Sequence, residues 1–322
     1  MFPKKAVVTM PMNPSHVDKI GFMSIFAYTH AMAVQKQAMS VYAVNLYGKC
    51  TSHDALQKFS RAVSTLAITP TEQWVDTCID TSCMQNVFAK LWHDGFFSEE
   101  ITDVSRCACG RVEYLANTQL YSSKKSLIKN DCSLCCHTKI ITAHEQVILT
   151  APLPRVQIPE VFPLWAGKDL QHVLQELAGT RLLVSRSTER IFQFSTRWLD
   201  NDLVWWLYLY WLQQRDESLQ VECLVAGASI VRQVGVLIAF SQLIGTPLPK
   251  SVSFLPKVFF DPLKNVRSLD QLIARFGTQR TVNALVWSAL SERKQFVLSG
   301  SMLPNMNEAE GGIQRTKLRI TK

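Results

Sequence analysis

Five of the nine cysteines fall within thirty residues, in a pattern that can bind a metal ion. They form a Cys-Ala-Cys-Gly motif at residues 107–110 and a Cys-Ser-Leu-Cys-Cys-His motif at residues 132–137. Two pairs of thiolates on tight turns can converge on one tetrahedral ion, and zinc is the usual occupant because it accepts sulfur and imposes no geometry of its own. The pattern therefore predicts a structural zinc site. Its expected ligands are Cys107, Cys109, Cys132 and Cys135.

The two halves of this motif differ in how closely they follow a standard zinc site. Cys132 and Cys135 have the usual two-residue spacing, whereas the first pair is separated by one residue and relies on Gly110 for its turn. Cys136 and His137 are possible substitute ligands. The alternative is a set of free thiols in a reduced cytosolic protein, but exposed clustered thiols without a metal are prone to oxidation. The four other cysteines are scattered, and we interpret them as small buried hydrophobic residues.

A proline-rich turn that ends in histidine follows the first apolar segment. Residues 11–16 read Pro-Met-Asn-Pro-Ser-His. At the carboxyl end of a strand in an open parallel sheet, next to a helix N-terminus, His16 can donate to phosphate oxygens. The alternative interpretation is helix capping by Ser15 or Asn13, with His16 merely in the first turn.

Two further segments could contact a nucleotide. Residues 264–268 (Lys-Asn-Val-Arg-Ser) place two cations and a hydroxyl on one loop, which suits a triphosphate. The alternative is a basic surface loop, with Ser268 capping a helix over residues 269–276. Residues 225–229 (Val-Ala-Gly-Ala-Ser) predict a strand-to-helix turn that allows close approach of a ligand, although short turns of this kind are common.

The elements that must position these motifs follow an α/β pattern. A β-branched run at residues 5–10, helical spacing of apolar residues at 18–37 and a second run at 40–46 predict a βαβ unit and hence a parallel sheet. Residues 55–95 are helical in pattern, and the proline-rich residues 151–163 are expected to be a linker that returns from the cysteine region. Residues 203–212 are intensely apolar and predict a buried strand or helix.

Composition limits the class of protein. With 322 residues, of which 47% are hydrophobic, the chain can bury a large core as one composite domain or two. A net charge of +8 and a pI of about 9.0 indicate an acidic partner, either nucleic acid or an anionic substrate. The N-terminus lacks the long apolar run of a signal peptide, and residues 203–212 are too short to span a bilayer. We expect a cytoplasmic protein without membrane partners.

The order of the motifs resembles the class I aminoacyl-tRNA synthetases, and among them the methionyl branch. The family's first signature, Pro-x-x-Asn-Gly-x-x-His-x-Gly-His, is matched in part by Pro11, Asn13 and His16. Its second signature, Lys-Met-Ser-Lys-Ser, resembles residues 264–268. The Ser-Arg and Trp-Leu-Asp-Ala segments near the family's amino-acid pocket are similar to two further stretches. These are residues 182–186 and 197–200, and the resemblance as a whole covers residues 5–292.

The departures from the family pattern are also informative. Lys19 stands where the family has its second histidine, and Asp18 stands in place of the intervening glycine. Ser229 replaces an acidic residue that contacts the ATP ribose, and Arg267 replaces the second lysine of the second signature. The chain leaves no room for the family's C-terminal helical domain, which reads the anticodon, so we expect poor selection of a tRNA.

The resemblance implies a Rossmann-like doubly wound parallel sheet that is split by a zinc-knuckle insertion. It also implies a division of the chain into five parts. These are two halves of the nucleotide-binding core (1–95 and 161–254), the insertion (96–160), the signature loop with its helices (255–300) and a flexible basic tail (301–322).

The chemistry implied by the resemblance is attack of an amino-acid carboxylate on the α-phosphate of ATP, with Mg²⁺ bound to the nucleotide. The catalytic residues would be His16 and Lys19 at one side, with Lys264 and Arg267 on the β- and γ-phosphates. Pro11, Asn13, Gly227, Ser229 and Ser268 would complete the nucleotide site. Trp198 and Asp200 would line the amino-acid pocket, with Asp200 holding the α-ammonium group.

Three classes of function are compatible with the sequence. The first is an amino-acid-activating ligase that transfers its product to a tRNA or to a small-molecule amine. The second is a catalytically inactive synthetase-like paralogue that binds RNA or a protein partner, because the second histidine and the ribose-side acid are missing. The third is a zinc-knuckle nucleic-acid binder without an ATP site, which the high pI and the basic tail favour.

Overall fold

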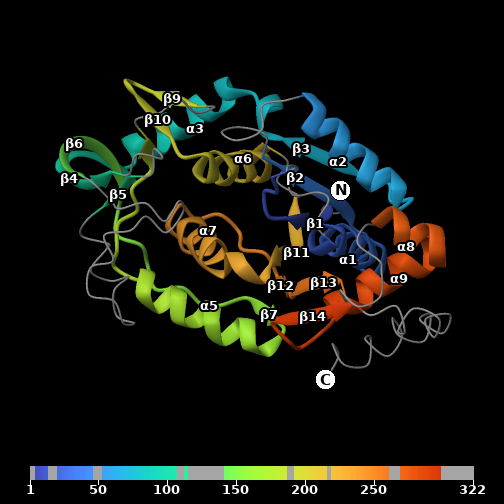
Figure 1. Cartoon of the computed structure of the whole chain (residues 1–322). Helices are drawn as coiled ribbons and strands as arrows, with labels where there is room; N and C mark the ends of the chain where they lie inside the picture. Colours follow the sequence, from blue (N-terminus) through green and yellow to red (C-terminus); the bar gives the residue numbers. More distant parts are fainter. Residues whose placement is uncertain are drawn as a thin grey trace.

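A parallel six-stranded sheet forms the middle of the molecule (Figure 1). The strand order is β3-β2-β1-β11-β12-β7, and every neighbouring pair is parallel. The strands are β1 (Lys5–Thr9), β2 (Met39–Val44), β3 (Glu72–Val75), β7 (Glu160–Phe162), β11 (Gln220–Gly227) and β12 (Ser251–Leu255). The computed structural model describes residues 4–13, 20–45, 53–106, 112–114, 141–186, 192–215, 219–260 and 269–298.

Helices cover both faces of this sheet, which makes it doubly wound. The side chains of β1 alternate between two cores, with Ala6 and Val8 in one cluster and Val7 in the other. The first core lies under α3 (Thr81–His93), α5 (Leu164–Leu177), α6 (Asn201–Arg215) and α7 (Val231–Leu243). The second core lies under α1 (Ile20–Lys36), α2 (His53–Thr65), α8 (Leu269–Phe276) and α9 (Thr278–Ala289).

Aromatic residues supply much of the packing on both faces. On the α1 face, the ring of Phe26 lies 5.2 Å from that of Tyr42 and 5.0 Å from that of Phe59, measured between centroids. On the other face, Trp74 of β3 meets Tyr208 of α6 edge to face at 5.6 Å. Full burial of a large apolar side chain contributes about 1.5–3 kcal/mol, so these clusters hold the helices against the sheet.

A long antiparallel hairpin projects from the core after α3. Strands β4 (Phe97–Arg106) and β6 (Ile141–Thr150) pair along their whole length, and β5 (Val112–Tyr114) adds to β4. Arg181 fixes this hairpin to the core, because its Nε donates to the carbonyl oxygen of Thr150 at 2.9 Å and its guanidinium also contacts Glu100 and Ser98. A small sheet, in the order β8-β10-β9, follows α5. Its strands are β8 (Ser185–Arg186), β9 (Gln193–Phe194) and β10 (Arg197–Leu199).

The C-terminal elements pack on α1. Strands β13 (Lys257–Phe260) and β14 (Gln295–Leu298) form a parallel pair, and α8 and α9 lie between them in the chain. The hydroxyl groups of Ser24 on α1 and Ser288 on α9 are 3.3 Å apart in the buried contact between these helices. Lys294 connects this unit to α5, because its Nζ lies 2.6 Å from Asp169 Oδ2 and 5.1 Å from the centroid of the Trp165 ring.

The predicted βαβ unit is confirmed. Two interpretations of single segments change, and a third, which allowed a strand or a helix, is narrowed to a helix. The helical pattern over residues 55–95 contains the strand β3, because residues 72–75 pair with β2. The stretch 151–163 is not only a linker, since its residues 160–162 form the edge strand β7. Residues 203–212 belong to a helix, α6. Within the described part of the chain, no helix is both long enough and apolar enough to cross a membrane.

Candidate functional site

The carboxyl ends of β1 and β11 lie side by side at the point where the strand order reverses. The backbone N–H of Met10 donates to the carbonyl oxygen of Val225 at 2.9 Å. The N–H of Met12 donates to Ala43 at 3.0 Å, and the N–H of Asn45 donates back to Met12 at 2.8 Å. In open α/β sheets, ligands bind in the crevice outside the strand ends at this switch point. These bonds place Pro11 and Asn13, which flank the buried Met12, at that edge.

Gly227 is the last residue of β11 and is partly buried at the carboxyl end of the strand. Its φ of −78° and ψ of 150° are extended values that any residue can adopt. A Cβ atom built on it would lie 4.0 Å from both Ile25 Cδ1 and Ser229 Oγ, which is an ordinary contact distance. Neither backbone conformation nor packing therefore requires glycine here, and the bare backbone leaves room for a ligand. Ser229 follows in the short 3₁₀ helix η3 (Ala228–Ile230) and is exposed, as the predicted strand-to-helix turn implies.

Two segments that border the signature-like loops also lie beside each other: the first turn of α1, which follows residues 14–19, and β13, which precedes residues 261–268. Helix α1 begins at Ile20 and packs on β1, β2 and β11. A Cβ atom at Gly21 would lie 3.9 Å from the backbone nitrogen of Val258, so the first turn of α1 lies beside β13. Strand β13 ends at Phe260, and α8 begins at Leu269. The chain therefore enters residues 261–268 next to the start of α1. His16, Lys19, Lys264, Arg267 and Ser268 themselves lie outside the described residues.

The two segments expected near an amino-acid pocket are neighbouring strands. In the small sheet, Trp198 pairs with Arg186 and Leu199 pairs with Ser185. Asp200 then leads into α6, because its N–H donates to Val184 at 2.8 Å and its carbonyl oxygen accepts from Val204 at 3.1 Å. Trp198 and Asp200 are both partly buried.

The direction of helix α6 indicates that this region lies toward the carboxyl ends of the sheet strands. A short connection joins the end of α6 to the start of β11, so the helix runs antiparallel to that strand. Its first residues, and with them Asp200, therefore lie toward the carboxyl edge, where Gly227 also ends its strand. Figure 1 shows α6 and α7 on the same side of the sheet. The arrangement can present an amino acid and a nucleotide to one crevice.

One cation in this region was missed by motif analysis. Arg197, which pairs with Phe194 and precedes Trp198, has a buried Nε without a hydrogen-bond partner among the described residues. A buried guanidinium nitrogen needs an acceptor, so this group can bind an anionic or carbonyl oxygen. A cation inside an otherwise apolar strand segment was the signal that the sequence offered.

Other buried polar groups lie beneath the sheet and do not line the crevice. The Tyr28 hydroxyl lies 3.1 Å from Ser253 Oγ, and Cys223 Sγ lies 3.4 Å from the same oxygen. Burial raises the pKa of the Tyr28 phenol and also raises the pKa of the Cys223 thiol. Both groups are therefore neutral at pH 7, and the thiol is unreactive.

The predicted zinc ligands Cys107, Cys109, Cys132 and Cys135 all lie outside the described residues, so the zinc site stays a prediction. Among the residues that the structure describes, no three His, Cys, Asp or Glu side chains gather in a way that could hold a metal ion. Cys223 is buried as expected, whereas Cys78 is exposed and Cys83 is only partly buried, so the interpretation of the scattered cysteines as buried was wrong for Cys78 and holds in part for Cys83. Cys50 lies outside the described residues.

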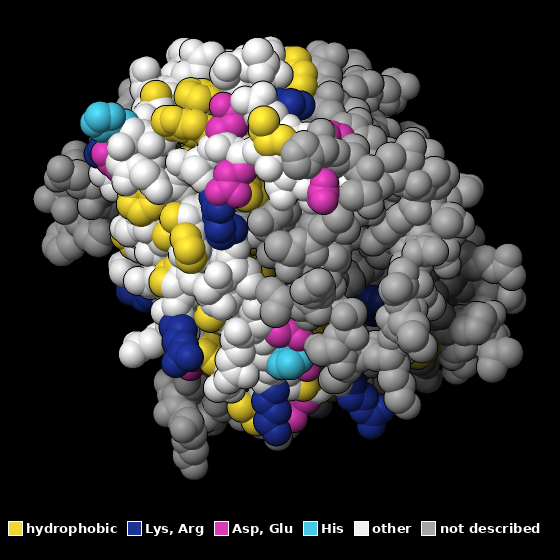
Figure 2. Space-filling model, turned by 90° about the vertical axis from the view of Figure 1, so that its left-hand side faces the viewer, with side chains coloured by type: hydrophobic (Ala, Val, Ile, Leu, Met, Phe, Trp, Pro, Cys, Tyr) yellow, Lys and Arg dark blue, Asp and Glu magenta, His cyan; other side chains and the backbone are white. Residues whose placement is uncertain are grey.

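One face of the molecule bears on the nucleic-acid hypothesis. In Figure 2, the coloured Lys and Arg side chains are scattered and have acidic side chains among them, with hydrophobic atoms between. Nucleic-acid binders concentrate basic residues on one face or along one helix. The charges visible among the described residues of this face do not form such a surface.

Comparison with known proteins relates the fold to one group of enzymes. No family model and no curated protein matches the chain in sequence. Two structures of Mycobacterium tuberculosis methionyl-tRNA synthetase with methionyl-adenylate superpose with TM-scores of 0.67 and 0.69, and the apo form of that enzyme superposes with 0.62. Identity is 13% in each case, over 94–96% of this chain and 66–68% of the other. The likeness confirms the predicted Rossmann-like α/β fold and shows that it is similar to the fold of methionyl-tRNA synthetase.

Proposed function

We propose that this chain is an ATP-dependent amino-acid-activating ligase that forms an aminoacyl adenylate at the carboxyl edge of its parallel sheet. The observation that carries the proposal is the adjacency of the β1 and β11 ends, fixed by the bond from Met10 to Val225. The proposal is also supported by Asn13, which follows β1 beside this point, and by the first turn of α1, which lies beside β13. The similarity to an enzyme solved with methionyl-adenylate supports the same choice.

In the proposed reaction, the carboxylate oxygen of the amino acid attacks the α-phosphorus of ATP. The bond between the α-phosphorus and the bridging oxygen breaks, and pyrophosphate leaves with the electron pair. Charge grows on the leaving phosphates, so cations that are already in place lower the barrier. We assign this task to Lys264 and Arg267, with His16 and Lys19 on the opposite side of the triphosphate. Mg²⁺, when bound with ATP, would neutralise part of the same charge.

The amino acid would lie between β10 and the start of α6. Asp200 would pair with the α-ammonium group, and Trp198 would form an apolar wall. The partly buried positions of both side chains suit such a role, because a charge-assisted bond is stronger where water is reduced. The acceptor of the aminoacyl group would be a tRNA end or a small-molecule amine.

A second candidate function is a catalytically inactive synthetase-like paralogue that binds RNA or a protein. It is favoured by three replacements in the signature segments: Lys19, Ser229 and Arg267. Arginine keeps a positive charge but not the compact ammonium geometry of lysine.

Amino-acid-dependent exchange of pyrophosphate into ATP tests the proposal directly. The twenty standard amino acids and hydroxylated analogues would be screened with Mg²⁺ and ATP, and exchange with at least one of them is expected. ATP binding without exchange for any amino acid would rule out activation and select the inactive paralogue. A gel-shift titration with tRNA over a salt series would identify the acceptor class, since phosphate contacts weaken steeply with salt.

A further inference from the structure

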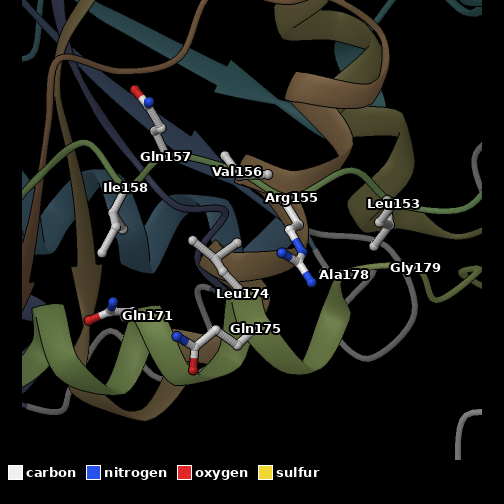
Figure 3. A pocket seen from close by; sticks show the side chains of 10 residues that line it. All are labelled: Leu153, Arg155, Val156, Gln157, Ile158, Gln171, Leu174, Gln175, Ala178 and Gly179. Carbon is white, nitrogen blue, oxygen red and sulfur yellow. The ribbon is translucent and has the colours of Figure 1, made fainter.

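A groove lies between α5 and the extended chain that precedes β7 (Figure 3). Its volume is about 990 Å³, and residues 153–158 form one wall while the second half of α5 forms the other. Because this chain segment comes before β7 and α5 runs back from the end of that strand, the groove lies toward the amino ends of the strands. It is therefore separate from the crevice at the carboxyl edge.

The first wall has peptide groups without a partner among the described residues. Leu153 N–H donates to Thr180 at 2.8 Å, and Glu160 N–H donates to Lys250 at 3.3 Å. Between these anchors, the N–H groups of residues 155–158 donate to no other group in the part of the chain that the structure describes. A stretch of extended backbone with free N–H and C=O groups is a template to which another peptide can add as a strand.

The second wall presents two amides at a matching interval. Gln171 and Gln175 are exposed on α5 and lie one helical turn apart, which corresponds to about 6 Å along the axis. An extended peptide repeats every two residues over about 6.6 Å, so both amides can meet the backbone of the same strand. Each amide can donate and accept at once. Figure 3 shows both glutamines on α5, with Leu174 between them pointing toward the extended segment.

The remaining lining is apolar except for Gln157 and one cation. Leu153 and Leu174 are buried in the floor, and Ile158 is 37% exposed at the rim. Arg155 is exposed, and no carboxylate among the described residues lies within 4.0 Å of it. A ligand that suits this groove would be extended and partly apolar, with a carboxylate near Arg155.

We propose that the groove binds an extended peptide segment of a partner protein, with an Asp or Glu side chain of that segment paired to Arg155. The free backbone of residues 155–158 and the amides of Gln171 and Gln175 would hold the main chain, and the apolar floor would accept alternate side chains. RNA fits less well, because a nucleic-acid strand needs several cations along its backbone and Arg155 is the one charged residue in the described lining.

The proposal can be tested with a phage-displayed library of random decapeptides selected on the full chain. Recovered peptides would be synthesised with a fluorophore and titrated by anisotropy. We expect enrichment of sequences with one Asp or Glu. Arg155→Glu should weaken their binding by about tenfold or more, since a charge-assisted bond is lost and repulsion replaces it. A peptide with Lys in place of its acid should regain affinity for Arg155→Glu.

Arg61→Glu, an equal charge change on the exposed side of α2, serves as the matched control and should leave binding unchanged. The substituted side chains are exposed, so thermal unfolding should show that every variant is folded. Three results would overturn the proposal. The first is that no peptide is enriched, and the second is that Arg155→Glu and Gln171→Ala/Gln175→Ala both bind the peptides as tightly as the unmodified chain does. The third is that single-stranded RNA, whose own binding needs Arg155, displaces the peptides.

Discussion

Met10 and Val225 are joined by a hydrogen bond of 2.9 Å between the backbone N–H of the first and the carbonyl oxygen of the second. The bond closes the pair β1–β11 at its carboxyl end, where the two strands leave the sheet toward α1 and α7. A nucleotide that lies across this point must pass the bare backbone of Gly227, which ends β11. The identity of residue 227 should therefore matter to ligand binding more than to folding.

Substitution of Gly227 is expected to separate the effect on ligand binding from the effect on folding. Gly227→Ala places a methyl group at ordinary contact distance, so the free energy of unfolding should stay the same or rise by about 0.4–1 kcal/mol through the unfolded state. Gly227→Val should fill the crevice further and raise the KM for ATP in pyrophosphate exchange. Denaturant unfolding and exchange kinetics would measure the two effects.

Gly235 is the matched control for this prediction. A Cβ atom there would lie 2.5 Å from Val173 Cγ1, in the contact between α7 and α5. Gly235→Ala should therefore destabilise the fold by about 1–3 kcal/mol through overpacking, without a specific effect on ATP. If Gly227→Val lowers the free energy of unfolding as much as Gly235→Ala does, residue 227 is packed against the protein and does not border a ligand site.

Removal of a cation from the second signature-like segment should slow activation. Lys264→Ala is expected to reduce the rate of pyrophosphate exchange by two orders of magnitude or more, since about 3 kcal/mol of transition-state stabilisation would be lost. Lys90→Ala, an exposed lysine on α3, is the control and should be neutral. Equal exchange by Lys264→Ala and the unmodified chain would show that residues 264–268 are not the phosphate loop.

The sequence predicted the elements whose pattern depends on their own residues. The helix expected over residues 18–37 appears as α1, because a run of apolar residues at helical spacing buries it along most of its length. The first two strands are β-branched or aromatic and buried, so their pattern was also clear. The parallel sheet followed from the βαβ rule alone.

Two strands of the parallel sheet were assigned to other structures, because these segments become strands only by pairing with a neighbouring strand. Residues 72–75 are only partly apolar, and they become β3 by pairing with β2. Residues 160–162 lie in a proline-rich stretch and become β7 by pairing with β12. The buried Nε of Arg197 poses the same difficulty, because the burial of a side chain depends on tertiary packing and not on its own segment alone.

The zinc prediction can be checked by metal analysis of the purified chain. We expect inductively coupled plasma mass spectrometry to find one zinc ion per chain. The double variant Cys132→Ser/Cys135→Ser should lose this ion. Cys78→Ser changes an exposed thiol outside the motif and should retain the ion. Chelation should lower the melting temperature, because the binding free energy of a structural zinc is also folding free energy. Retention of zinc by the double variant would contradict the ligand assignment.

Asp200→Asn tests the proposed contact with the α-ammonium group. Asparagine serves as well as aspartate before the first turn of a helix, so α6 should keep its start and the melting temperature should change little. Loss of the negative charge should raise the KM for the amino acid by about 10- to 100-fold, the equivalent of a charge-assisted hydrogen bond. The KM for ATP should remain close to its original value. A parallel rise of both KM values would instead indicate a general distortion of the crevice.

The buried phenols of Tyr28 and Tyr42 should make the protein unstable in alkali. Burial raises the pKa of both groups above their ordinary value, and the Tyr42 hydroxyl also donates to the carbonyl oxygen of Phe26 at 2.9 Å. The unfolded chain, with tyrosine pKa values of about 10, therefore loses these protons first. Stability from these groups is fully present below pH 10 and falls above it, by about 1.4 kcal/mol per pH unit for each tyrosine.

Urea unfolding between pH 9 and 11, followed together with tyrosinate absorbance, would measure this effect. Tyr28→Phe removes one phenol, whose oxygen lies 3.1 Å from Ser253 Oγ, and should cost about 1 kcal/mol at pH 7. The same variant should lose stability less steeply above pH 10, by about 1.4 kcal/mol per pH unit, because one proton fewer is released on unfolding. An unchanged slope in Tyr28→Phe would mean that Tyr28 already ionises in the folded protein.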